Sequence, residues 1–105
     1  MTDFTKILEQ AQQMQGRLEQ IQGELEKMSV TGSAGGGMVT VHANGKGQIT
    51  KVRVEPSIVN PADIEMLEDL LLVALHDAQQ KSADLAKQEM AKLTGGLGLP
   101  FKLPL

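Results

Sequence analysis

The sequence predicts an α+β domain in which a helix, a three-stranded antiparallel meander and a second, longer helix follow one another. Apolar residues recur at steps of three and four through residues 4 to 28, which is the spacing of a helix packed along another helix. Residues 30 to 54 change to alternation at period two, with glycine-rich turns between the runs, as expected of short strands. Helical spacing then returns and continues until Thr94-Gly95-Gly96, where glycine favours helix termination.

The first helix is predicted from one apolar seam. The seam alternates three-residue and four-residue steps without interruption, and its members are Phe4, Ile7, Ala11, Met14, Leu18, Ile21, Leu25 and Met28. Gly16 and Gly23 lie one heptad apart on the side opposite the seam. Each glycine costs a helix about 1 kcal/mol relative to alanine, so we expect tertiary packing to support this segment.

Three strands are predicted at residues 30–34, 38–43 and 48–54, with a turn at Gly35-Gly36-Gly37. Asn44-Gly45-Lys46-Gly47 indicates a hairpin, because Asn-Gly readily takes the positive φ angles of a tight turn. Alternation assigns one set of side chains to the core, namely Val39, Val41, Ala43, Thr50, Val52 and Val54. The opposite face receives Met38, Thr40, His42, Ile49, Lys51 and Arg53.

The second helix is predicted to start with Asn60 as N-cap and Pro61 in its first turn, and to run to about Leu93. At 1.5 Å per residue it is roughly 50 Å long, so its end should project beyond a small sheet. Its first half is apolar on more sides than one neighbour can bury. We therefore expect a second copy of the chain to cover it, and the predicted dimer-interface residues are Leu67, Leu70, Leu71 and Ala74.

The length of 105 residues suits one small domain; we expect residues 1–94 to form it and the Gly/Pro/Leu-rich residues 95–105 to form a tail. With no cysteine, thiolate zinc sites, disulfides and thiol nucleophiles are excluded. The start of the chain resembles no secretory signal, and no apolar run reaches about 18 residues, so a cytoplasmic protein is expected. Phe4 and Phe101 are the only aromatic residues, which argues against a base-stacking surface.

The charge is unevenly distributed along a chain whose net charge is −3. Residues 61–80 contain five acidic residues and no lysine or arginine, whereas residues 81–105 contain four lysines and two acidic residues. Acid at a helix start and base at its end complement the helix dipole. The same pattern also suits cationic helix ends that bind DNA phosphates. The two interpretations are compatible, and the second predicts steep salt dependence with little base readout.

Catalytic and cofactor sites find little support in the sequence. His42 and His76 are the only histidines, and helical neighbours of His76 at i−4 and i+4 are not metal ligands. The triple glycine is followed by a strand and lacks the Gly-Lys-Ser/Thr of a phosphate loop. We expect no enzymatic activity, no cofactor, no metal and no small-molecule substrate.

Several short segments, taken in order, resemble the YbaB/EbfC family of bacterial nucleoid-associated proteins. They are Ala11-Gln12-Gln13-Met14-Gln15, Gly35-Gly36-Gly37 before Val39-Thr40-Val41, Asn44-Gly45-Lys46-Gly47, Met66-Leu67-Glu68-Asp69-Leu70, and Lys92-Leu93-Thr94-Gly95-Gly96 followed by Leu99-Pro100. The tail departs from the family pattern at Phe101, where glycine is expected.

The resemblance implies a tweezer-like homodimer whose helical arms bind double-stranded DNA with little sequence preference. It also implies a place in the nucleoid and a role in nucleoid organisation or gene expression. Carried over by segment, the DNA-binding candidates are Lys6, Arg17, Lys81, Lys87 and Lys92.

An alternative function is a protein-interaction module. In this interpretation a partner helix docks on the apolar seam of the first helix, or on the acidic start of the second helix between Asp63 and Asp77. The acidic segment motivates it, because five carboxylates within twenty residues repel phosphate.

Overall fold

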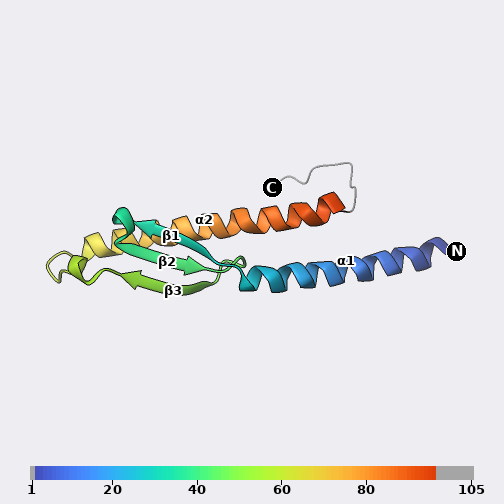
Figure 1. Cartoon of the computed structure of the whole chain (residues 1–105), viewed down its shortest axis with the longest axis horizontal. Helices are drawn as coiled ribbons and strands as arrows, with labels where there is room; N and C mark the ends of the chain where they lie inside the picture. The colour runs from blue at the N-terminus through green and yellow to red at the C-terminus, as the bar shows by residue number, and fades with distance from the viewer. Residues whose placement is uncertain (1, 97–105) are drawn as a thin grey trace.

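A computed structural model describes residues 2–96 of the chain (Figure 1); Met1 and most of the predicted tail, residues 97–105, lie outside this range. The elements, in chain order, are α1 (Thr2–Lys27), β1 (Val30–Ala34), β2 (Val39–Ala43), β3 (Ile49–Val54) and α2 (Ile64–Gly96). Short 3-10 turns at Gly35–Gly37 and Pro56–Ile58 connect them. The predicted fold class, a helix, a three-stranded meander and a long helix, is confirmed.

The three strands form one antiparallel sheet in the order β1-β2-β3. The triple glycine makes the first turn with φ angles between 63° and 94°, a conformation that only glycine adopts readily. In the second hairpin Val41 lies opposite Val52, but an irregularity next to Ala43 brings Ile49 opposite it. The alternation predicted for β3 therefore breaks at Thr50, as it does at a β-bulge.

The core lies between α2 and the first two strands. Val39, Val41 and Ala43 of β2 are fully buried together with Ala74 and Ala78 of α2. These small helix residues let α2 approach closely, and a Cβ added to Gly32 of β1 would collide with the α2 backbone at Ala74 and Ala78. The prediction that Val52 is part of the core is wrong for the single chain: its side chain is 47% exposed, because α2 packs on β1 and β2.

The start of α2 also differs from the prediction. The helix begins at Ile64, and its cap is Asp63, whose Oδ1 accepts the N–H of Met66 at 3.3 Å. Asn60 and Pro61 lie in a turn before the helix, where the Asp63 N–H donates to the Asn60 carbonyl at 2.9 Å. Asparagine and aspartate cap helices about equally well, so the sequence offered two caps three residues apart.

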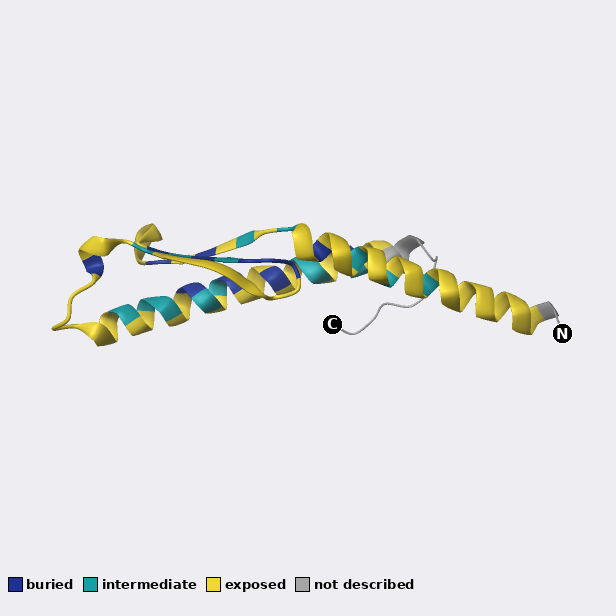
Figure 2. Ribbon diagram, turned by 90° about the horizontal axis from the view of Figure 1, so that it is seen from below, coloured by how far each residue is buried: buried dark blue, intermediate teal, exposed yellow. Residues whose placement is uncertain are grey.

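The two helices extend from the same end of the sheet and run antiparallel, as Figure 1 shows. This makes the described chain long and thin, with extents of 73 × 23 × 16 Å. Figure 2 shows that buried residues concentrate around the sheet, while α1 is exposed along most of its length. The projecting helices expected from the sequence are present.

Candidate nucleic-acid interface

The surface considered for nucleic-acid binding consists of two arms: α1, and the part of α2 from residue 82 onward that extends beyond the sheet (Figure 1). The arms contact each other near their roots, where Leu25 is buried and Leu18 and Ile21 are half-buried. Towards its N-terminus α1 becomes exposed, and Phe4 retains 68% of its accessible surface. The polar faces of both arms are therefore open to a large ligand.

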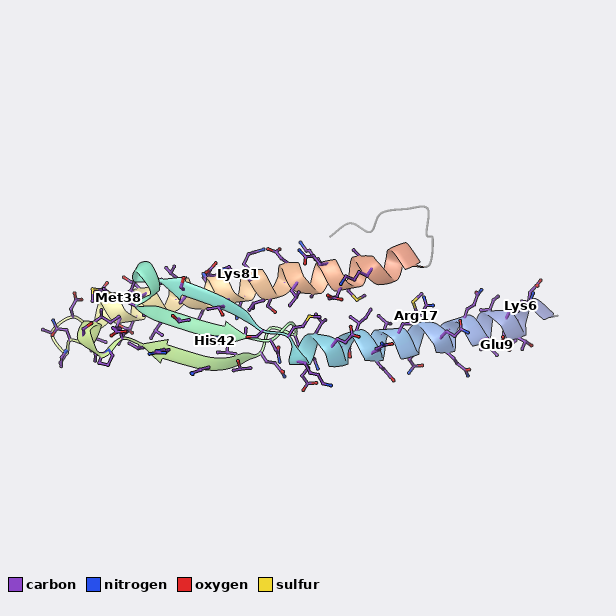
Figure 3. All side chains as sticks on the ribbon, in the orientation of Figure 1. Lys6, Glu9, Arg17, Met38, His42 and Lys81 are labelled. Carbon is purple, nitrogen blue, oxygen red and sulfur yellow. The ribbon has the colours of Figure 1, made fainter. Side chains whose placement is uncertain are left out.

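Lys6 and Arg17 are exposed cations of the first arm (Figure 3), and Lys27 is a third, in its last turn beside the sheet. Among residues 2–96 neither the Lys6 nor the Arg17 side chain has a hydrogen-bond or ion-pair partner. They lie eleven residues apart, which is about three helical turns, so they share one face of α1. Gln10 and Gln13 occupy the same face between them. This face presents two cations and two amide donors in a row, a pattern suited to a polyanion.

In the second arm Lys87 is exposed and unpaired within the described part of the chain, whereas Lys92 donates to Glu89 Oε1 at 3.1 Å. The Lys92 side chain is 72% exposed and that of Glu89 is 9% exposed. Residues 81–92 carry three lysines against Asp84 and Glu89, a net charge of +1. The fourth lysine counted for residues 81–105 is Lys102, which lies outside the described residues.

Lys81 lies at the base of the arm, beside the sheet. Its Nζ donates to the Thr31 carbonyl at 2.9 Å and to Asp77 Oδ2 at 3.2 Å. Asp77 Oδ2 also accepts the backbone N–H of Ser33 at 3.1 Å. This Ser33 hydrogen bond and the adjacent Lys81 hold the pKa of Asp77 below its usual 3.8. Lys81 and Asp77 thus bind α2 to β1.

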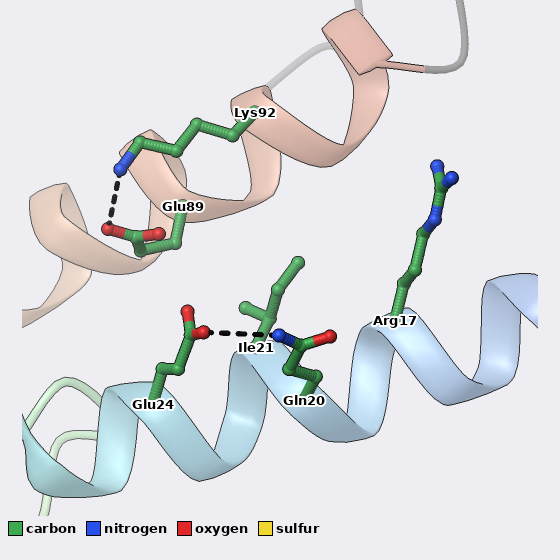
Figure 4. Close-up of a pocket in the computed structure, with 6 residues that line it drawn as sticks. All are labelled: Arg17, Gln20, Ile21, Glu24, Glu89 and Lys92. Carbon is green, nitrogen blue, oxygen red and sulfur yellow. Dashed lines mark hydrogen bonds and ion pairs between the residues drawn. The ribbon is translucent and has the colours of Figure 1, made fainter.

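An open groove of about 280 Å³ lies between the arms (Figure 4). Both signs of charge line it: Arg17 and Lys92 are opposed by Glu24 and Glu89. Glu24 further accepts a hydrogen bond from the amide of Gln20 at 3.4 Å. Such mixed lining does not favour a phosphate inside the groove. Lys6 and Lys87 lie outside this groove, whereas Arg17 and Lys92 line it.

The family model of the YbaB/EbfC DNA-binding family matches residues 1–97 of the chain. The chain belongs to this family. It is 48% identical to a nucleoid-associated protein of Gemmatimonas aurantiaca, over 97% of this chain and 98% of that protein. It is 47% identical to a nucleoid-associated protein of Desulfotalea psychrophila, over 93% of this chain and 92% of that protein.

The fold is shared with the crystal structure of an uncharacterized protein from Helicobacter pylori. The TM-score is 0.78 and the sequence identity 23%, covering 87% of this chain and 96% of that one. The YbaB/EbfC family is a family of DNA-binding nucleoid-associated proteins and is not a family of enzymes. DNA is therefore the partner that the family membership supports, as the resemblance implied.

Three further structural facts about this YbaB/EbfC chain concern metal binding, the histidines and the membrane. Within residues 2–96, no three His, Cys, Asp or Glu residues gather closely enough to hold a metal ion. His42 Nδ1 lies 3.3 Å from the Thr31 hydroxyl across two strands, and His76 is exposed on α2. Neither described helix has an apolar stretch long enough to cross a membrane.

The predicted dimer-interface residues of this family member lie mainly towards its own sheet. Ala74 is fully buried there, and Leu67, Leu70 and Leu71 pack against the core while remaining half-buried. Their role in a dimer stays a prediction. The sequence-based choice omitted the neighbouring Leu72 and Val73, which are more than half exposed. The sequence signal is the pair of small residues Ala74 and Ala78, whose four-residue spacing marks one line on the helix and leaves positions 72 and 73 on other faces.

Proposed function

We propose that this chain acts as a homodimer that binds double-stranded DNA through its helical arms with little sequence preference. The observation that carries the proposal is that Lys6, Arg17 and Lys87, on the arms of a YbaB/EbfC-family fold, are exposed and have no partner among residues 2–96. Lysine and arginine side chains neutralise phosphates and release counterions, which supplies affinity without reading bases. The consequence for the cell is an effect on nucleoid organisation or gene expression, exerted in the cytoplasmic nucleoid.

Weak sequence preference follows from the composition of the arms. A protein recognises a DNA sequence through bidentate hydrogen bonds to base edges, or by inserting apolar side chains that deform the duplex. The arm cations that have no partner among the described residues are spaced several turns apart on long helices, which suits contacts with the DNA backbone. The mixed charge of the arms keeps the expected affinity modest.

Dimerisation is supported by apolar surface that the single chain leaves open. Val52 on β3, together with Leu72 and Val73 on α2, is about half exposed. Further exposed apolar side chains flank the start of α2, at Val59, Ile64 and Met66. A chain of this size buries a limited core by itself, so association of two copies adds the burial that one copy lacks. Leu67, Leu70 and Leu71 are half-buried and remain candidates for the rim of that contact.

The test is duplex binding by fluorescence anisotropy over a series of salt concentrations. Wild-type protein should lose affinity as salt rises, with a negative slope of log K against log salt. The triple variant Lys6→Ala, Arg17→Ala, Lys87→Ala should weaken binding and reduce that slope by about one for each phosphate that is no longer neutralised. Light scattering with and without duplex measures the assembly in the same samples.

A matched control removes charge from the sheet. The variant Lys51→Ala, Arg53→Ala changes two exposed cations of β3, which lies away from the arms, and is compared with Lys6→Ala, Arg17→Ala on α1. The β3 variant should leave affinity and slope close to wild type. Equal losses in the two double variants would show that net charge, and not the arms, controls binding. A monomer in the bound state would refute the dimer.

Protein docking remains a second candidate function because part of the α1 seam is uncovered. Phe4 and Ile7 are among the most exposed apolar residues in the described chain, and the start of α2 is acidic, with Asp63, Glu65 and Glu68 exposed. Pull-down from lysate after nuclease treatment distinguishes the two functions. Partners retained after the DNA is digested favour docking, whereas partners lost with the DNA favour the nucleic-acid interface.

A further inference from the structure

The turn between β2 and β3, residues 44–48, lies where the two arms leave the sheet (Figure 1). Asn44 and Gly45 are buried, although the turn is a hairpin loop of only a few residues. Hairpin loops usually lie on the surface, as Lys46, Gly47 and Gln48 do here, so burial of the first two residues indicates contacts with other elements. Those contacts go to α1 on one side and to α2 on the other.

On the α1 side, the Gly45 N–H donates to the carbonyl of Leu25 at 2.8 Å. The last carbonyls of a helix lack its regular internal bonds. The Leu25 carbonyl accepts the Met28 N–H at 3.2 Å, and the turn adds a second, shorter bond from outside the helix. The approach is close: a Cβ added to Gly45 would lie 2.6 Å from Leu25 Cδ2 and 2.9 Å from the Leu25 carbonyl oxygen. Only glycine therefore permits this contact between the turn and the end of α1.

On the α2 side, the Ser82 hydroxyl donates to the Asn44 carbonyl at 2.8 Å. Ser82 is 2% exposed and lies in the middle of a 33-residue helix, where serine is otherwise a weak choice. The bond spans 38 residues of sequence. It connects the turn to α2 at the position where the second arm begins.

The turn itself is held rigid from within. Asn44 Oδ1 accepts the N–H groups of Lys46 at 2.9 Å and Gln48 at 3.1 Å, and Asn44 Nδ2 donates to Gln48 Oε1 at 2.7 Å. Consecutive groups of one short turn are thus bonded to the end of α1, to α2 and to each other. A rigid connector between two helices fixes the angle between them.

We propose that the joint, defined as the 44–48 turn with Leu25 and Ser82, sets the spread of the two arms and so positions their cations for DNA. The second part of this inference, that the spread of the arms affects DNA binding, rests on the proposed function. Lys6 lies nineteen residues from Leu25, about 28 Å along the helix. A tilt of about 10° at the joint therefore moves Lys6 by about 5 Å, more than the ~3.4 Å axial spacing of phosphates on one strand. Ser82 and Gly45 are positioning residues that do not contact DNA themselves.

The first measurement is the distance between the arms, without DNA. The chain has no cysteine, so Gln10→Cys and Gln88→Cys, both at exposed positions, introduce one spin label on each arm. Diluting the labelled chain with excess unlabelled chain removes distances between copies of a dimer. We expect Ser82→Ala to broaden the distance distribution and Gly45→Ala to shift its mean by several Å. Circular dichroism confirms that each sample is folded.

Matched variants separate the joint from general destabilisation. Ser57→Ala makes the same change at the exposed Ser57, which lies beyond β3 in the Pro56–Ile58 turn, and Gly23→Ala adds a methyl group where nothing lies within 4 Å. Both should reproduce the wild-type distribution. Ser82→Thr retains the hydroxyl and should restore a narrow distribution. If the distance distributions of Ser82→Ala and wild type are superimposable, the proposed role of the joint is refuted. This test does not depend on Gly45→Ala, so Ser82→Ala alone still decides it if Gly45→Ala does not fold.

The second measurement is duplex affinity of the unlabelled variants by anisotropy. Ser82→Ala and Gly45→Ala should bind about 3-fold to 10-fold more weakly than wild type, although they change no charge. An altered distance with unchanged affinity would refute the link to DNA. Absence of DNA binding by the wild type would refute the proposed function, while the distance measurement would still decide whether the joint sets the arms.

Discussion

The two helices carry similar charged residues but differ in how the fold uses them. α2 packs on β1 and β2, and two of its three described arm-side lysines are bonded to neighbours, Lys81 to β1 and Lys92 to Glu89. α1 contacts the rest of the chain near Leu25, and its Lys6 and Arg17 have no partner among residues 2–96. Cationic side chains that look alike in the sequence therefore differ in how accessible they are to a polyanion. α2 acts largely as structure, and Lys6 and Arg17 of α1 are more accessible than Lys81 and Lys92 of α2.

The largest loss of stability is expected from a substitution that disrupts the packing of α2 on β1. A Cβ at Gly32 would collide with backbone atoms of Ala74 and Ala78, and backbone cannot move aside as a flexible side chain can. Gly32→Ala should cost about 3 kcal/mol or more, at the upper end of overpacking effects. Urea unfolding followed by circular dichroism measures this cost.

The control for Gly32→Ala is the same substitution in α1. Gly23 has open space around it, so Gly23→Ala should stabilise the helix by up to about 1 kcal/mol. If both variants were destabilised alike, the contrast between a packed α2 and an open α1 would be wrong.

A second prediction compares the root and the tip of the α1 seam. Leu25 is 5% exposed and Phe4 is 68% exposed, although both belong to one heptad pattern. Leu25→Ala should cost about 2 kcal/mol, the lower end for buried leucine. Phe4→Ala should change stability by less than about 0.5 kcal/mol, as for exposed sites. Thermal unfolding at several protein concentrations measures both, and a concentration-dependent loss in Phe4→Ala would show that a second copy covers the tip.

The fold could be predicted from the sequence because its signals are periodic and local. The seam from Phe4 to Met28 specifies a helix, and Asn44-Gly45-Lys46-Gly47 marks the hairpin between two alternating runs. The reason given for the hairpin is wrong, because the positive φ angle of this turn is at Gly47 (83°) and not at Asn44 or Gly45. The Lys81–Asp77 and Lys92–Glu89 pairs also have local signals, since they are four and three residues apart on a helix. Local spacing could have shown that both lysines are paired.

The remaining features depend on contacts between distant residues, which a single sequence does not specify. The bond between Ser82 and Asn44 spans 38 residues, and that between Ser33 and Asp77 spans 44. Which strands α2 covers is decided by such contacts, and this is why Val52 alternates like a core residue but is exposed. The N-cap prediction was wrong for another reason: Asn60 and Asp63 are both adequate caps, and the sequence alone does not choose Asp63, which caps the helix.

The smallest expected effect concerns the attachment of α2 to β1 by Asp77. The Ser33 N–H and Lys81 lower the pKa of Asp77 below 3.8 in the folded state, so the carboxylate form is favoured by folding. A lowered folded pKa contributes stability that is present above the unfolded pKa and is lost as pH falls through the folded pKa. Asp77→Asn should therefore lower Tm slightly at neutral pH, and the difference from wild type should shrink below pH 3.8.

Thermal unfolding of wild type and Asp77→Asn between pH 2 and pH 7 measures this difference, and Asp84→Asn on the same helix is the control. Asp84 accepts a hydrogen bond from Gln80 within α2 and has no hydrogen bond or ion pair to β1 among residues 2–96, so its variant should show no comparable pH dependence. The effect is small because the Lys81–Asp77 pair is exposed to solvent, where ion pairs contribute little. A Tm difference that persisted unchanged at low pH would mean that Asp77 holds α2 by packing and not by its charge. The contrast between the helices would then rest on the alanine contacts at Gly32 alone.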